Sequence, residues 1–182
     1  MLSIEKIASA GTAGIILREK DLSYDEYKTL AENIIKICKR YGVKCILHSF
    51  VELAIELEAD SIHLPMPILR NITDNQKAAF KEIGASCHSA DEAKEALKLG
   101  CSYIIVGHIF DTDCKRGLPG RGLSFLKTVC DSVDIPVYAI GGINSRNIDM
   151  VKAQGACGAC IMSSLMTTEN VAEFLRSMED GR

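Results

Sequence analysis

The stretch SYIIVGHIFDTDCKRGLPGRGLSFL, residues 102–126, decides the fold. Its apolar run at 103–106 is of the kind that forms a strand buried on both faces of a sheet. Gly107 and His108 end this run, and a loop rich in charge and glycine follows. A buried strand that ends in a histidine and opens into such a loop is typical of the active end of an α/β enzyme.

Strand-like and helix-like segments alternate on both sides of this stretch. The expected strands are 14–17, 44–49, 61–64, 83–87, 103–106, 136–140 and 158–162. The expected helices are 4–10, one from a Ser23 cap to Gly42, 50–58, 73–81, 90–99, 123–132, one from an Asn144 cap to Gln154, and 168–178. Repeating β–α units imply parallel strands covered by helices, and right-handed crossovers favour closure into a TIM (β/α)8-type barrel.

The barrel expected from this pattern lacks its first β-strand, because the chain opens in what should be the first helix. A doubly wound open sheet is the alternative, since it explains seven strands without a deficit. We expect one domain over residues 1–182, truncated at its N-terminus. The edges exposed by the missing strand predict cover by a partner subunit, as in a homodimer, or reduced stability.

The composition excludes several classes of protein. Apolar residues make up 47% of the chain, charged residues 25%, and the formal net charge is −3, which gives no reason to expect nucleic-acid binding. No apolar run approaches the roughly 20 residues of a membrane span. The N-terminus lacks the pattern of a signal peptide, so we expect a cytoplasmic protein with no membrane partner.

Eight cysteines are scattered along the chain, mostly inside apolar patterns, where a cytosolic protein uses them as small hydrophobic residues. Cys157 and Cys160 have redox-pair spacing, but they lie in a strand-like run and not at a helix start. Cys114 falls in the charged loop, where we expect it to pack within the loop, with chemical reactivity as the alternative.

The ends of the last two expected strands suit a phosphate group. Gly141 and Gly142 permit close approach of the backbone, and amides with a hydroxyl from Ser163 or Ser164 can bind an anion; the alternative is a tight turn. Arg18 and Lys20, after the first expected strand, can meet a carboxylate or phosphate. Their alternative is a salt-bridged strand end.

His108 is the best candidate for proton transfer, because an imidazole with a pKa near 6.5 can accept and return a proton at neutral pH. His48, His63 and His88 also fall at or near strand ends and are weaker candidates. The spacing of the four histidines matches no metal-binding pattern, and carboxylates are scarce at the strand ends, so no metal is expected.

Five segments together resemble the thiamine phosphate synthase/TenI superfamily. They are ILREKDL (16–22), GASCHSADEA (84–93), VGHIFDTDCKRGLPGRGL (106–123), AIGGI (139–143) and IMSS (161–164). The resemblance covers nearly the whole chain, implies a TIM barrel, and supports phosphate binding at the last two strand ends.

Two activities compete within this superfamily. The synthases join a pyrimidine pyrophosphate to a thiazole phosphate and need Mg²⁺, and their pattern has Asn-Asp at the place of His48-Ser49 and an aspartate near position 68. This chain lacks both carboxylates. The loop pattern after Gly107 resembles the thiazole tautomerase (TenI) branch, which implies isomerisation of a carboxythiazole phosphate without a cofactor. The alternatives are the synthase, a transferase, and a non-catalytic regulatory protein that binds thiazole or thiamin phosphate.

The resemblance also implies roles for particular residues. His108 matches the catalytic histidine of the tautomerases. Gly142, Met162 and Ser163 are expected to hold the phosphate, with Gly141 and Ser164 beside them. By position alone, Arg18 or Lys20 faces the substrate carboxylate, and Lys115 lies in a loop that closes over the site. The expected partner is a small-molecule thiazole phosphate.

Overall fold

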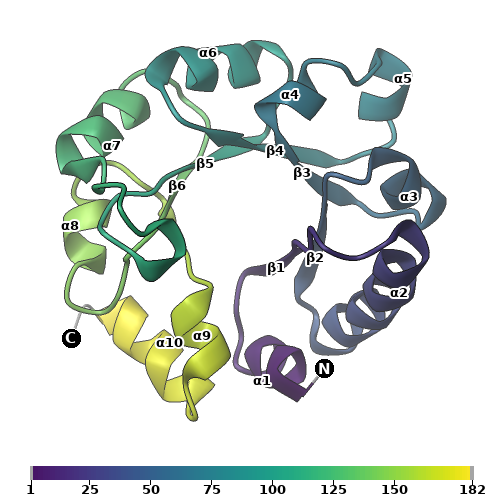
Figure 1. The fold of residues 1–182 in the computed structure, drawn as a ribbon, viewed down its shortest axis with the longest axis horizontal. Helices are drawn as coiled ribbons and strands as arrows, with labels where there is room; N and C mark the ends of the chain where they lie inside the picture. Colours follow the sequence, from purple (N-terminus) through teal and green to yellow (C-terminus); the bar gives the residue numbers. More distant parts are fainter. Residues whose placement is uncertain (1, 181–182) are drawn as a thin grey trace. The chain divides into compact units, whose positions relative to one another are not determined.

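The computed structural model describes residues 2–180 and divides the chain into two compact units, one ending at Ile83 and the other beginning at Gly84. Strands and helices alternate through both units (Figure 1). The strands of each unit pair in chain order and in parallel, β1-β2-β3 in the first and β4-β5-β6-β7 in the second.

The first unit holds three strands and five helices among the described residues. In chain order they are α1 (Leu2–Ser9), β1 (Gly14–Leu17), α2 (Tyr24–Tyr41), β2 (Lys44–His48), α3 (Val51–Glu56), β3 (Ser61–Pro65), α4 (Met66–Leu69) and α5 (Asp74–Lys77). The strand β4 (Glu82–Cys87) begins in this unit and ends in the next.

The longest helix, α2, begins and ends as its sequence predicts. The Ser23 side chain accepts a hydrogen bond from the backbone N–H of Glu26, whose carboxylate accepts one from the Ser23 N–H, so the expected capping box is present. Gly42 ends the helix in the left-handed conformation, with φ of 67°. Arg40 near its C-terminus forms an ion pair of 2.8 Å with Glu5, which ties α1 to α2.

Tyr27 connects α2 to the ends of two strands. Its side chain is fully buried, and its hydroxyl donates to the Leu17 carbonyl at 2.7 Å and accepts from the His48 N–H at 3.1 Å. Because Leu17 and His48 are the last residues of β1 and β2, this contact positions the segments that follow both strands.

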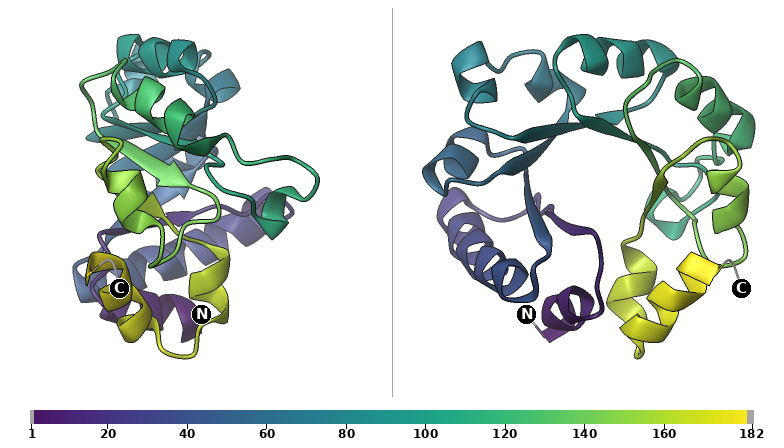
Figure 2. Two further views of the ribbon diagram at one scale, coloured as in Figure 1. Left: turned by 90° about the vertical axis from the view of Figure 1, so that its left-hand side faces the viewer. Right: turned by 180° about the vertical axis from the view of Figure 1, so that it is seen from behind.

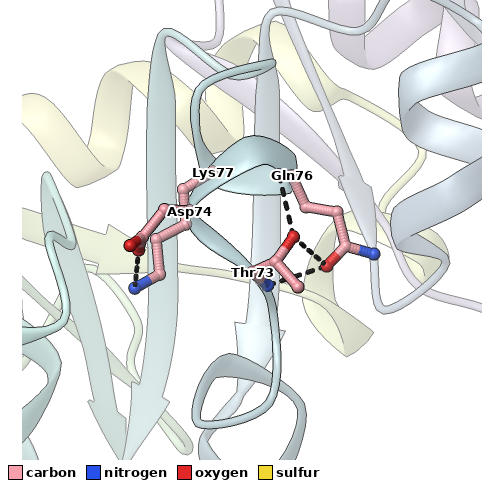
Figure 3. A network of polar contacts seen from close by, with 4 residues as sticks. All are labelled: Thr73, Asp74, Gln76 and Lys77. Carbon is pink, nitrogen blue, oxygen red and sulfur yellow. Dashed lines mark hydrogen bonds and ion pairs between the residues drawn. The ribbon is translucent and has the colours of Figure 1, made fainter.

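The short helix α5 is held by its own side chains. Thr73 and Gln76 form a second capping box, and Lys77 forms an ion pair with Asp74 at 3.3 Å (Figure 3). The helix covers only 74–77 of the expected 73–81. No helix was expected between the strand at 61–64 and residue 73, but α4 begins at Met66, with Pro67 in its first turn, where proline is tolerated.

The second unit carries the stretch that opened the sequence analysis. Its elements after β4 are α6 (Ala90–Lys98), β5 (Tyr103–Gly107), the 3₁₀ turn η1 (Asp113–Lys115), α7 (Gly122–Cys130), β6 (Val137–Ile140), α8 (Ile148–Lys152), β7 (Gly158–Cys160), α9 (Ser163–Thr167) and α10 (Val171–Asp180). All five residues of β5 are buried, as expected for a central parallel strand.

The register of these strands brings their ends to one edge. Cys87 of β4 pairs with Val106 of β5, Gly107 pairs with Ile140 of β6, and Ile140 pairs with Cys160 of β7. The residues that follow these strands therefore lie along the same edge of the sheet, where parallel α/β proteins place functional groups.

One helix start differs from the expectation. Asn144 does not cap a helix: its side-chain oxygen accepts from the Arg146 N–H at 2.9 Å, and its carbonyl accepts from the Asn147 N–H at 3.1 Å. These bonds form a turn, and α8 begins only at Ile148. Asparagine stabilises such turns as readily as helix starts, so composition alone did not separate the two.

The expected α/β class with parallel strands is confirmed. In each unit the helices that follow the strands lie on one face of those strands (Figure 1), and the strand order never reverses. A doubly wound sheet needs helices on both faces and a reversal of order, so the TIM-type arrangement fits better. In residues 2–180, α1 precedes the first strand, as expected for a chain without the strand before that helix. Barrel closure and a single domain over 1–182 stay predictions.

Across the described part of the chain, each helix is too short or too polar to span a bilayer.

Candidate active site

The loop between β5 and α7 begins at His108, and its last residue, Arg121, returns to contact His108. The half-buried His108 follows β5 directly, and its Nε2 lies 3.2 Å from the Leu118 carbonyl oxygen. The Arg121 N–H donates to the His108 carbonyl at 3.0 Å. The loop projects beyond the ends of the strands of its unit and carries η1 at its tip (Figure 2, left). His108 therefore anchors the loop from both its backbone and its side chain.

Gly141 and Gly142, at the end of β6, lie against this loop. Both have positive φ, 101° and 67°. A Cβ atom on Gly141 would come within 2.3 Å of the His108 Cβ, and one on Gly142 within 2.5 Å of the Asp111 carbonyl oxygen. No side chain fits in these gaps without movement of the backbone. Close packing of the β5 loop thus requires both glycines, and their binding of phosphate stays a prediction.

The end of β7 meets the tip of the same loop. Met162 and Ser163 are exposed at the start of α9. The Ser163 hydroxyl lies 3.1 Å from the Cys114 thiol of η1, and the Cys114 side chain is exposed, so the choice between packing and reactivity stays a prediction. Lys115, the next residue of η1, is exposed.

The structure thus gathers most of the expected site in the second unit. His108, Gly141, Gly142 and the Ser163 hydroxyl are connected through the β5 loop, and Lys115 lies in η1 of that loop. Met162 and Ser164 flank Ser163 in the chain, and their roles, like those of the others, stay predictions.

Arg121 is a further residue of this region that sequence reasoning did not single out. Its guanidinium donates to the His88 carbonyl at the end of β4 and lies 4.9 Å above the centre of the Phe125 ring. The contact holds the returning end of the β5 loop to the neighbouring strand. Its signal in the sequence was the Arg-Gly pair that occurs twice in the loop, at 116–117 and 121–122, but the sequence analysis described this loop only as rich in charge and glycine.

Arg18 and Lys20 lie in the first unit, directly after β1, and both are exposed. Among the ion pairs of the described residues none includes either cation, so a salt-bridged strand end is not what the structure contains. Both cations act on His48 at the end of β2: burial, then Arg18 and Lys20, lower its pKa to about 4.

His48 and His63 form a pair that sequence reasoning missed. They are register partners on β2 and β3, and their ring centres lie 5.7 Å apart with the rings inclined at 29°. Burial, followed by His48 and Arg18, lowers the pKa of His63 to about 3, so both imidazoles are neutral at neutral pH. The signal was present in the sequence, because both residues lie at strand ends, but their pairing depends on the register.

Comparisons with known proteins show what this chain is similar to. A family model described as thiamine monophosphate synthase matches residues 2–165. The thiamine-phosphate synthase of Syntrophomonas wolfei is 32% identical over 181 residues, which is 96% of this chain and 85% of that protein. The thiamine-phosphate synthase of Caldivirga maquilingensis is 35% identical over 171 residues, or 91% of this chain and 81% of that protein.

Solved structures agree with these relatives. The thiamine phosphate pyrophosphorylase of Pyrococcus furiosus has a TM-score of 0.84 and 27% identity over 99% of this chain and 87% of its own. A 3-hexulose-6-phosphate synthase has a TM-score of 0.75 at 16% identity, over 99% of this chain and 91% of its own, a likeness that concerns the fold alone.

The relatives overturn the expectation of a thiazole tautomerase. Curated proteins that this chain matches over more than nine-tenths of its length are named thiamine-phosphate synthase, so the predicted isomerase activity is wrong and the synthase alternative is the one supported. The tautomerase prediction depended on the pattern after Gly107 and on missing carboxylates near positions 49 and 68. These are short segments, whereas the identity to synthases extends over most of the chain.

Proposed function

The chain belongs to the thiamine monophosphate synthase family, and from this premise we propose that it is a transferase that joins a pyrimidine pyrophosphate to a thiazole phosphate. The observation that carries this proposal is the identity to proteins named thiamine-phosphate synthase over more than nine-tenths of the chain. The strand-end edge of the second unit supports it, because a glycine backbone and a serine hydroxyl, groups suited to phosphate, lie there.

In this proposal the second unit holds the thiazole phosphate. The Gly142 backbone and the Ser163 hydroxyl are placed by the β5 loop, and Lys115 in that loop supplies a positive charge. Backbone amides and a hydroxyl bind phosphate oxygens without a buried cation. His108 and Arg121 position the loop by their contacts with Leu118 and His88. A direct catalytic role of His108 stays a prediction.

The chemistry forms one bond and breaks one. The thiazole ring supplies an electron pair to the pyrimidine methylene carbon, and the bond from that carbon to the pyrophosphate oxygen breaks, with its electron pair leaving on pyrophosphate. No proton moves to or from carbon in this step. The protein therefore needs to align two rings and to stabilise the charge that develops on the leaving group.

Magnesium is the metal that the family resemblance implies for this leaving group. In residues 2–180, no group of three or more histidine, cysteine, aspartate or glutamate side chains is placed to hold a metal ion. The end of β2 carries His48-Ser49 and β3 is followed by Met66–Leu69, and neither stretch has a carboxylate. The residues present do not fit a protein-held magnesium ion, so we derive no step through one.

The test is formation of thiamine phosphate from the two substrates by the purified full chain, with release of pyrophosphate measured in parallel. We expect one pyrophosphate for each product molecule. Ser163→Ala is expected to raise the KM for the thiazole phosphate about 10-fold, the effect of losing one hydrogen bond to a charged group. Ser9→Ala, at an exposed serine of α1, is the matched control and keeps the wild-type KM.

Absence of product at every concentration of divalent cation tested would contradict the proposal. Binding of thiazole phosphate without turnover would instead support the regulatory alternative.

A further inference from the structure

Three side chains at the ends of β2 and β3 form a cluster that the proposed reaction has not used. His48 and His63 stack at 5.7 Å between ring centres. The Ser49 hydroxyl lies 2.6 Å from His48 Nδ1, and the Ser49 N–H donates to the His63 carbonyl at 3.2 Å. Ser49 adopts a positive φ of 69°, which is uncommon for a residue other than glycine. We call His48, Ser49 and His63 the imidazole cluster.

Two cations act on the imidazoles of this cluster. Arg18 and Lys20, after the neighbouring strand β1, are the charged groups that act on His48, and Arg18 also acts on His63. From α2, the neutral Tyr27 hydroxyl contacts the His48 backbone. Burial raises the pKa of Tyr27 to about 12, with smaller contributions from Cys45 and Glu19.

We propose that the imidazole cluster, with Arg18 and Lys20, binds the pyrophosphate group of a substrate and that His48 takes up a proton as it binds, in place of a metal ion. This inference rests on the proposed function, because the proposed reaction has a leaving group of that class. It also accounts for the lack of carboxylates at 48–49 and 66–69, since a carboxylate there would repel an anion that no metal ion bridges.

The sign of the proton movement follows from the charges. Without a ligand, burial and two cations disfavour the charged form of His48. A pyrophosphate between Arg18, Lys20 and His48 offsets the cations and places negative charge beside the imidazole, which favours its protonated form. The imidazolium N–H then makes a charge-assisted hydrogen bond, which is stronger than a bond from a neutral donor.

Ser49 suits both protonation states of His48. A hydroxyl can donate to Nδ1 of the neutral ring and accept from the Nδ1–H of the imidazolium. In this proposal Nε2 is the nitrogen that contacts the pyrophosphate, and the Ser49 contact to Nδ1 sets the orientation of the ring. His63, which is 2% exposed, supports the ring of His48 from β3.

The experiment is isothermal titration calorimetry of the full chain with inorganic pyrophosphate and excess EDTA, near the ordinary histidine pKa of about 6.5. Two buffers with different ionisation enthalpies give the number of protons taken up. We expect binding without metal. We also expect His48→Gln to take up fewer protons than the wild type, by a difference that approaches one, and to bind roughly 10- to 100-fold more weakly.

Matched variants separate the cluster from general charge effects. Lys20→Gln should weaken binding, whereas Lys36→Gln, an exposed lysine on α2, should not.

Imidazole nitrogen chemical shifts of the wild type provide a readout that needs no variant. Pyrophosphate should move one of the four histidines to imidazolium values.

Two results would overturn the proposal: pyrophosphate that binds only when Mg²⁺ is added, or His48→Gln protein that takes up as many protons as the wild type. Four unchanged histidine signals in the pyrophosphate complex would overturn it as well.

Failure of the proposed function can be told apart from failure of this inference. If the chain binds pyrophosphate without metal but forms no product, the proposed transferase activity is contradicted and the imidazole cluster remains an anion site. If the chain forms product but binds pyrophosphate only with magnesium, the proposal for the imidazole cluster alone is contradicted.

Discussion

Replacement of Gly142 by alanine tests whether the end of β6 is shaped by close packing. Gly142 has a φ of 67°, and an added Cβ would lie 2.5 Å from the Asp111 carbonyl oxygen and 2.7 Å from the Phe110 Cβ. The positive φ costs alanine roughly 1–2 kcal/mol. Overpacking against backbone that must shift adds about 1–3 kcal/mol. Gly142→Ala should therefore lower the free energy of unfolding by about 2–5 kcal/mol.

The matched control is Gly42→Ala at the end of α2. Gly42 has the same φ of 67°, but nothing lies within 4 Å of its added Cβ. This variant should lose only the roughly 1–2 kcal/mol of the backbone conformation. The difference between the two variants isolates the packing of the β5 loop on the end of β6, because the conformational cost is common to both.

Urea unfolding of both variants measures this difference, and thermal unfolding checks it, at roughly 2–4 °C per kcal/mol for a chain of this length. Gly142→Ala should also raise the KM for the thiazole phosphate, and Gly42→Ala should not. Equal losses of stability in the two variants would refute the packing argument. Unchanged substrate affinity in a folded Gly142→Ala protein would refute the placement of the phosphate at this strand end.

Three further predictions concern other parts of the chain. Tyr27→Phe should lower the free energy of unfolding by urea by about 1–3 kcal/mol, because the Leu17 carbonyl and the His48 N–H lose a partner. Tyr41→Phe, at a half-exposed side chain, should change this free energy by less than about 0.5 kcal/mol. Similar values for both variants would contradict the connecting role of Tyr27. The pKa of His63 is about 3 in the folded chain, and that of an unfolded histidine is about 6.5. Between these pH values only the unfolded chain binds a proton at this residue. Stability should therefore fall as the pH is lowered through this window, by at most about 1.4 kcal/mol per pH unit from His63. His63→Gln should flatten that part of the profile, and an unchanged slope would show that His63 is not held neutral. Of the eight cysteines, the exposed Cys114 and Cys157 should react fastest with a thiol reagent. Thiazole phosphate should slow the reaction of Cys114 alone. Fast labelling that persists in a Cys114→Ser, Cys157→Ser double variant would contradict the placement of these thiols.

The local features of this fold could be predicted from short stretches of sequence. The Ser23–Glu26 capping box and the glycine that ends α2 lie where the pattern places them, because caps depend on residues within one turn. The apolar run of β5 predicted a buried parallel strand for the same local reason. Local patterns misjudged the short elements: α4 and α9 were not expected, and Asn144 forms a turn where a cap was predicted.

The features of the candidate site also divide into those that the sequence predicts and those that only the tertiary structure shows. The sequence alone determined that chemistry-bearing residues follow the strands, since buried apolar runs end at Leu17, Gly107 and Ile140 and parallel strands place such ends on one edge. Only the tertiary structure decided which of them touch. The pairing of His48 with His63 depends on the register of β2 against β3, and the contact of Cys114 with Ser163 joins residues 49 positions apart. Such contacts are set by the packing of whole elements, which no local pattern of residues contains.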